Sequence, residues 1–103
     1  MPKVEVLGQI DGPIEGYVTV LTRIHVEPGE QVARHTHPGV ESTYFLEGEG
    51  VVMADGFPDK PCKAGDWFQV PPGVPHSVRI GSGGVVAVGN YLVEKDKPLT
   101  TWL

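Results

Sequence analysis

The stretch GEQVARHTHPGVESTYFLEG, residues 29–48, carries the pattern that decides the fold of this chain. His35 and His37 are two residues apart, and Glu41 follows after a Pro38-Gly39 turn. Residues i and i+2 of a β-strand point to the same face, about 6.6 Å apart, so both imidazoles can approach one point above a sheet. After the turn, Glu41 can present its carboxylate to the same point from the neighbouring strand. The segment therefore predicts two adjacent strands that share a polar site.

A second stretch, GDWFQVPPGVPH at residues 65–76, supplies another histidine. His76 follows a proline-rich corner and begins a strand whose inward face also carries Val78 and Ile80, with Arg79 pointing outward. By the same alternation from Glu41, Thr43 and Phe45 point inward. Polar groups turned toward a core are costly unless they are paired, and a metal ion removes that cost. Three imidazoles and one carboxylate contain a ligand set that suits iron, manganese, nickel, copper or zinc.

Fixed residues at fixed spacings make the two stretches resemble the two sequence motifs of the cupin superfamily. The first motif spans residues 29–48 and the second spans residues 65–80, with 16 residues between them. One position departs from the pattern, because Ile80 stands where the family often has an asparagine that is not a metal ligand. The matching residues are Gly29, His35, His37, Glu41 and Gly48 in the first motif, and Gly65, Pro71, Gly73 and His76 in the second.

This resemblance implies a small all-β domain, a double-stranded β-helix or RmlC-like jelly-roll barrel. It also implies that His35, His37, Glu41 and His76 are the ligands of one divalent transition metal. With four protein ligands, an octahedral ion would keep two positions open for water, O2 or a bidentate substrate. Open positions are typical of catalytic sites more than of structural ones.

Composition agrees with a β-rich chain. Of 103 residues, 14 are Gly and 10 are Pro, which disfavours long helices. Apolar and polar residues alternate with a period of two over short windows that end at turn residues, which is typical of strands. We expect one domain over residues 1–103, with a loop at Gly81–Gly84 and with Cys62 as an ordinary residue of a connecting loop. Strands are expected near residues 3–7, 17–26, 31–37, 41–47, 50–54, 66–70, 76–80, 85–93 and 99–102.

Charge and terminal sequence restrict the partners. The formal net charge is −5 and the basic residues are scattered singly, which disfavours nucleic acid. The N-terminus lacks the apolar run of a signal peptide, and no segment approaches a membrane span of about 18 apolar residues. A lone cysteine cannot form an intrachain disulfide or a cysteine-based zinc site. We therefore expect a cytoplasmic protein that binds neither nucleic acid nor a membrane.

The reaction is less constrained than the site. No Lys, Asp or second Glu stands at an assigned inward position, so no catalytic side chain is named and the metal must carry most of the chemistry. The leading prediction is a dioxygenase-like oxidoreductase that acts on a small organic substrate. The alternatives are an O2-independent isomerase or lyase, a non-catalytic module that binds a small ligand or sugar, and a metal site kept for stability. Tyr44, Gln69 and Tyr91 become candidate polar helpers if the strand phase is shifted by one residue.

Four further features have simpler interpretations. His25 alternates with Arg23 and Glu27 and is predicted to lie on a solvated strand face. Trp67 and Trp102 are expected to be packing residues. The apolar tail Pro98–Leu103 is predicted to lie on a partner subunit, and a homodimer is expected because a barrel of this size has edge strands to cover.

Overall fold

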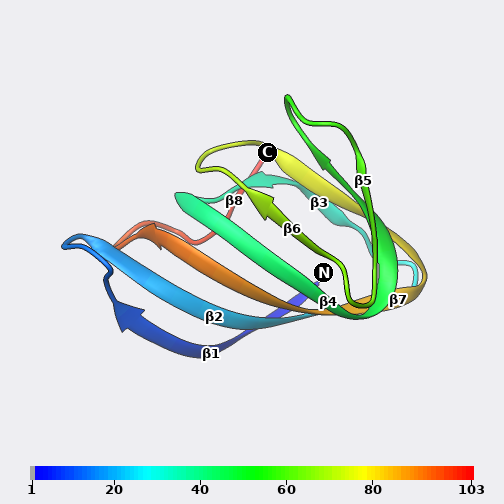
Figure 1. Cartoon of the computed structure of the whole chain (residues 1–103), viewed down its shortest axis with the longest axis horizontal. Coiled ribbons are helices and arrows are strands. Elements are labelled where there is room, and N and C mark those ends of the chain that lie inside the picture. Colours follow the sequence, from blue (N-terminus) through cyan, green and yellow to red (C-terminus); the bar gives the residue numbers. More distant parts are fainter. Residues whose placement is uncertain (1) are drawn as a thin grey trace.

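The computed structural model describes residues 2–103, and these form an all-β fold without helices (Figure 1). The predicted fold class is confirmed. No described helix could cross a membrane. The strands are β1 (Lys3–Asp11), β2 (Tyr17–Val26), β3 (Val32–Thr36), β4 (Gly39–Ala54), β5 (Lys60–Lys63), β6 (Trp67–Val70), β7 (His76–Glu94) and β8 (Thr101–Trp102).

All strand pairs are antiparallel. One path through the sheet runs β1-β2-β7-β3-β8, and β4 pairs with β5, β6 and β7. The long strands β4 and β7 pair from Gly39 opposite Val93 to Ala54 opposite His76, with two register shifts on the way. Figure 1 shows them bending together, which curves the sheet around its interior. The first half of β4 lies between β6 and β7, so Glu41 is central in the sheet.

The predicted loop at Gly81–Gly84 is wrong, because these residues continue β7. Gly48 and Gly84 both have positive φ, 83° and 72°. A Cβ on Gly48 would lie 1.9 Å from the carbonyl oxygen of Gly84, and a Cβ on Gly84 would lie 2.5 Å from that of Val26. Glycine therefore stands here because β2, β4 and β7 approach closely at a bend, a backbone geometry that other residues rarely adopt.

The side chains that were predicted from strand alternation to point inward do lie in the interior. Thr43, Phe45, Val78 and Ile80 are buried, as expected, and Arg79 is exposed. Most of the apolar core forms one cluster that includes Val26, Phe68, Val85 and Ala87. This core lies next to the polar residues of the first motif and supplies one wall of their surroundings.

The segment that contains Cys62 was expected to be a loop, but it forms β5, and Cys62 is buried at 3% exposure. Burial raises the pKa of its thiol. The expected packing role of Trp67 is also wrong, since its side chain is largely exposed with the Lys60 ammonium 3.9 Å above the ring. The solvated position of His25 is confirmed, with 49% of its side chain exposed.

The N-terminal strand β1 differs from the other long strands because all nine of its residues are exposed. Within residues 2–103 it pairs only with β2, so its other edge is open there. Val4, Val6 and Ile10 present apolar surface from it. β1 therefore contributes backbone pairing to the sheet and little to the core.

Candidate metal centre

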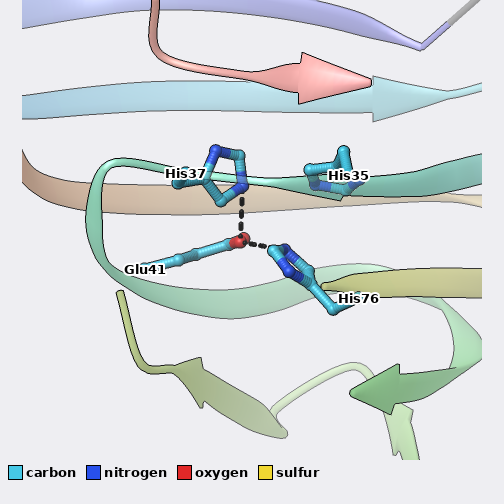
Figure 2. Close-up of side chains that lie close together, drawn as sticks. All are labelled: His35, His37, Glu41 and His76. Atoms are coloured by element: carbon cyan, nitrogen blue, oxygen red, sulfur yellow. Dashed lines mark hydrogen bonds and ion pairs between the residues drawn. The ribbon is translucent and has the colours of Figure 1, made fainter. Parts of the chain in front are cut away.

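The fold brings the four predicted ligand residues to one point. His35 lies on β3, His37 directly after it, Glu41 on β4, and His76 is the first residue of β7. One nitrogen or oxygen atom from each lies within 4.8 Å of the others, and all four side chains are buried (Figure 2). The pairing of β3 with β7 places His35 opposite His76. Residues that are up to 41 positions apart therefore form one compact group of metal-ligating atoms.

The Glu41 carboxylate lies between two of the imidazoles. Its Oε1 is 3.1 Å from His37 Nε2 and 3.0 Å from His76 Nε2 (Figure 2). The His35 ring completes the group, with its centroid 4.2 Å from that of His76 and 4.8 Å from that of His37. The chain thus offers three nitrogen donors and one oxygen donor at a single position.

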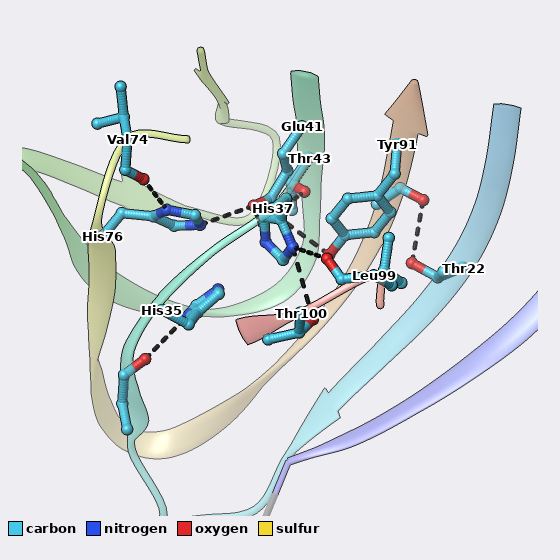
Figure 3. A network of polar contacts seen from close by, with 12 residues as sticks. Thr22, His35, His37, Glu41, Thr43, Val74, His76, Tyr91, Leu99 and Thr100 are labelled. Carbon is cyan, nitrogen blue, oxygen red and sulfur yellow. Dashed lines mark hydrogen bonds and ion pairs between the residues drawn. The ribbon is translucent and has the colours of Figure 1, made fainter. Parts of the chain in front are cut away.

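Backbone carbonyls fix the orientation of all three imidazoles. A carbonyl oxygen only accepts a hydrogen bond, so each neutral ring carries its proton on Nδ1 and directs the lone pair of Nε2 away from that contact. This is how metal-ligating histidines are usually held. The Nδ1 contacts run from His35 to Ala33 at 2.6 Å, from His76 to Val74 at 2.9 Å, and from His37 to Leu99 at 2.7 Å (Figure 3).

When the rings are neutral, this orientation leaves Nε2 lone pairs facing the Glu41 carboxylate. His76 relieves its contact when protonated, because its Nε2 then donates to Glu41 Oε1 at 3.0 Å. His37 Nε2 is buried and has no hydrogen-bond partner among the described residues, although Glu41 Oε1 is 3.1 Å away. Acceptors that face each other in a buried site are unfavourable unless a proton or a cation lies between them. Neutral imidazoles and an ionised carboxylate are the donor types that divalent transition metals take. The residues present therefore fit a metal ion.

The second carboxylate oxygen of Glu41 has different partners. Its Oε2 accepts a hydrogen bond from Thr43 Oγ1 at 2.6 Å and lies 3.4 Å from the Tyr91 hydroxyl (Figure 3). Close by, Thr22 Oγ1 donates to the Gly89 carbonyl at 3.0 Å. The hydroxyls of Thr43 and Tyr91 hold Oε2 of Glu41, and Oε1 therefore faces the histidines.

Of the three candidate polar helpers, the structure brings only Tyr91 into the site. Tyr91 is 4% exposed and its ring is 4.8 Å from that of His37. Tyr44 and Gln69 point outward and are exposed. The condition attached to Tyr91, a shift in strand phase, is met within β7. The buried side chains of β7 have even numbers from His76 to Ile80 and odd numbers from Val85 to Val93, so the shift between these two parts turns Tyr91 inward.

Burial and neighbouring charge set the protonation states of these groups. Burial lowers the pKa of His35 to about 4. Burial opposes ionisation of Glu41, but contacts with His37 and His76 outweigh it and hold the pKa of Glu41 well below its usual range. Burial also opposes protonation of His76, yet contacts with Glu41 and Val74 raise its pKa. Burial, with the charge of Glu41, raises the pKa of Tyr91. Glu41 is therefore ionised and Tyr91 protonated at neutral pH.

The C-terminal segment, for which contact with a partner subunit stays a prediction, contacts the site of its own chain. β8 pairs with β3, placing Trp102 opposite His35 with the ring centroids 5.0 Å apart. The Leu99 carbonyl holds His37, and Thr100 Oγ1 is 3.5 Å from His37 Nδ1. The sequence signalled these residues only through the apolar character of the tail, because a two-residue strand is too short to show alternation.

Comparison with known proteins identifies the family. A family model described as the cupin domain matches residues 22–89. A search of curated proteins finds no significant match. Among solved structures, a cupin-like protein from Thermotoga maritima superposes with a TM-score of 0.78 at 24% identity, covering 99% of this chain and 75% of that one.

Two enzymes have similar folds. A DMSP lyase from Ruegeria pomeroyi superposes with a TM-score of 0.75 at 21% identity, and oxalate decarboxylase from Bacillus subtilis with 0.73 at 22%. Each superposition covers 82% of this chain but only 42% of the lyase and 24% of the decarboxylase. The chain thus spans less than half the length of either enzyme, and at these identities the likeness shows the fold alone.

Proposed function

The chain belongs to the cupin superfamily, and from this we propose that it binds one divalent transition metal and is a metal-dependent enzyme acting on a small organic molecule. The proposed ligands are His35, His37, Glu41 and His76. One observation carries the proposal, namely the buried Nε2 of His37, which faces an ionised carboxylate without a hydrogen-bond partner among the described residues. A cation at this position is the simplest way to satisfy both groups.

A divalent ion held there would act as a Lewis acid and, as iron or manganese, would be reactive toward O2. The chain's own residues hold the ligand atoms in place and keep the site largely apolar. Tyr91 keeps its proton and is a poor base, because burial raises its pKa. No Lys, Asp or second Glu is among the described residues that line the adjoining cavity. This supports dioxygenase-like oxidation over a reaction in which a protein base removes a proton.

The competing reaction is O2-independent lysis or isomerisation, and a DMSP lyase is one protein that has a similar fold. A non-catalytic module that binds a small ligand or sugar is the alternative outside the enzymes. Turnover in the absence of O2 separates the two reactions, and ligand binding without turnover identifies the module.

Metal analysis tests the site directly. We expect about one equivalent of a transition metal in the purified or reconstituted protein, and a loss of metal in the His35→Ala plus His76→Ala double variant. His25→Ala is the matched control, because His25 is a solvated histidine outside the site. Less than about one tenth of an equivalent after reconstitution would refute the proposal.

The reaction class is tested with an oxygen electrode. The iron-loaded protein is expected to consume O2 in the presence of at least one member of a panel of small organic molecules, and the double variant is not. Turnover that is unchanged in an anaerobic chamber would exclude oxidation by O2. A compound that binds equally well to the double variant, without turnover, would indicate a binding module.

We also propose that residues 1–103 form one domain that associates as a cytoplasmic homodimer. The exposed apolar side chains of β1 beside its open edge support association, since such edges are normally covered. Light scattering is expected to give twice the chain mass of 11.1 kDa. A mass equal to a single chain would contradict the dimer.

A further inference from the structure

A cavity of about 90 Å³ adjoins the candidate metal centre and extends into the apolar core. Its walls include the buried side chains of Val26, Phe45, Ile80, Val85 and Ala87. No Lys, Arg, Asp, Asn, Gln or Ser is among the described residues that line it. Away from the four candidate ligands, Tyr91 is the one ionisable side chain among the described residues of these walls.

The other polar groups of the cavity are already engaged or lie toward its surface. Thr43 donates to Glu41 at 2.6 Å, and Tyr91 lies 3.4 Å from the same carboxylate oxygen. Thr100 is 3.5 Å from His37 Nδ1. The indole of Trp102 is about half exposed. The apolar end of the cavity therefore offers no partner to a charged group, and burying a charge without a partner is strongly unfavourable.

The size of the cavity limits what enters it. A water molecule takes roughly 30 Å³ of liquid volume, and a dry protein cavity of about 150 Å³ accommodates benzene. The 90 Å³ found here is smaller, so we expect room for a body of about three or four carbon atoms beyond the metal-binding group. Val4 and Trp102 line the cavity and are each about half exposed, which marks its mouth. A longer molecule would extend outward past these two residues.

Charge at the metal end favours one kind of head group. A divalent ion with three neutral imidazoles and one ionised glutamate has a local charge of about +1. A single anionic oxygen donor neutralises it. A second anionic group on the same molecule would have no cation to meet in the walls, because the described lining contains no Lys or Arg.

We infer that the ligand of this site binds through one anionic oxygen-donor group and inserts a short, uncharged, apolar body into the cavity. This inference rests on the proposed metal site and adds the substrate class to it. A ligand that lies wholly inside the cavity therefore cannot be a dicarboxylate, a phosphorylated sugar or an amino acid. Each of these brings a second charge or several hydroxyls, and the cavity walls have no group to pair with them.

Three hydroxamates that share one head group test the inference with the cobalt(II)-loaded protein. The visible absorption of cobalt reports binding of acetohydroxamate, of butyrohydroxamate and of N-hydroxysuccinamate, which has a carboxylate where butyrohydroxamate has its terminal methyl. We expect butyrohydroxamate to bind about tenfold more tightly than acetohydroxamate, because two more methylene-sized groups are buried. N-hydroxysuccinamate is expected to bind at least about tenfold more weakly than butyrohydroxamate. The affinity of each compound for free cobalt(II) is measured separately. Differences in the intrinsic metal affinity of the head group can then be subtracted from the affinities for the protein.

Ala87→Val narrows the cavity and is expected to abolish the preference for butyrohydroxamate while acetohydroxamate still binds. Ala54→Val is the matched control, since Ala54 lies on β4 and does not line the cavity. Equal affinities for all three compounds in the unchanged protein, or tightest binding of N-hydroxysuccinamate, would overturn the inference. Failure of the protein to take up cobalt would refute the metal site itself. That failure is recognised before any hydroxamate is added, because the visible absorption of protein-bound cobalt is then missing.

Discussion

The two ends of the strand path, β1 and β8, are edges of one sheet with opposite properties. β1 is nine residues long, pairs along β2 and is exposed throughout. β8 is two residues long, yet Trp102 packs beside His35 and the preceding Leu99 carbonyl holds His37. The shorter of the two edge strands is therefore the one that contacts two candidate ligands.

Removal of Leu99–Leu103 is expected to give the largest effect. The truncation takes away the carbonyl that orients His37 and the ring beside His35. Groups that orient metal ligands contribute about 10- to 100-fold to affinity, so a competition titration against a chelator should show a loss of that size. Thermal unfolding of the truncated protein confirms that it still folds. An unchanged affinity would mean that the C-terminal segment only lies over the site.

The pH dependence of the free energy of unfolding compares two histidines on the strands next to these edges, His35 on β3 and His25 on β2. The folded pKa of His35, which pairs with β8, is about 4, against about 6.5 in an unfolded chain. Between these values the unfolded state binds a proton that the folded state does not, so the free energy of unfolding falls as pH is lowered. From pH 6.5 to 5 we expect the metal-free protein to lose on the order of 1–2 kcal/mol in urea titrations.

The matched variants are His35→Gln, which should lose most of this pH dependence, and His25→Gln, which should keep it. His25 lies opposite Lys3 of β1 and is half exposed. The same pH dependence in both variants would contradict the assignment to His35.

The substitution Thr43→Val tests how Glu41 is oriented at a position far from the two edge strands in the sheet order. Thr43 donates to Glu41 Oε2 at 2.6 Å, and valine keeps the shape of the side chain while removing the donor. A loss of about tenfold in metal affinity is expected, measured by the same competition titration. Thr101→Val, on the exposed face of β8, is the control and should change little. If both variants behaved alike, the hydroxyl of Thr43 would have no specific role.

Ile10→Lys on β1 is expected to have the smallest effect on the site, a change in metal affinity of less than about twofold. Ile10 is 71% exposed and does not line the cavity. The same variant should lower the mass in light scattering from that of a dimer to that of a single chain, because the charge opposes association. A large loss of metal affinity would show that the two edges are not independent.

The sequence predicted that the four candidate ligands come together, because local rules govern most of that geometry. Alternation along β4 placed Glu41 and Thr43 on one inward face, and the spacing of His35 and His37 placed both rings on one side of the chain. The motifs that resemble cupins extended this to His76, which lies 39 residues after His37.

Interactions between distant segments escaped prediction. The tail around Leu99 contacts a histidine 62 positions away, and nothing in its own pattern indicates that contact. β5 was missed because Pro61 and two lysines surround Cys62 and hide a strand of four residues. Gly84 was predicted to lie in a loop, although its small size allows the close approach of β7 to the end of β2.

The three histidines also differ in how their orientation is secured. His35 and His76 each contact a carbonyl two residues earlier in the same segment, so these contacts form wherever the local backbone is in place. His37 relies on a segment held by a strand of two residues, and such short elements open locally at low free-energy cost. We therefore expect fraying of β8 to set the rate at which a bound ion exchanges with solution. Amide hydrogen exchange at Thr101 and Trp102 would report the same opening.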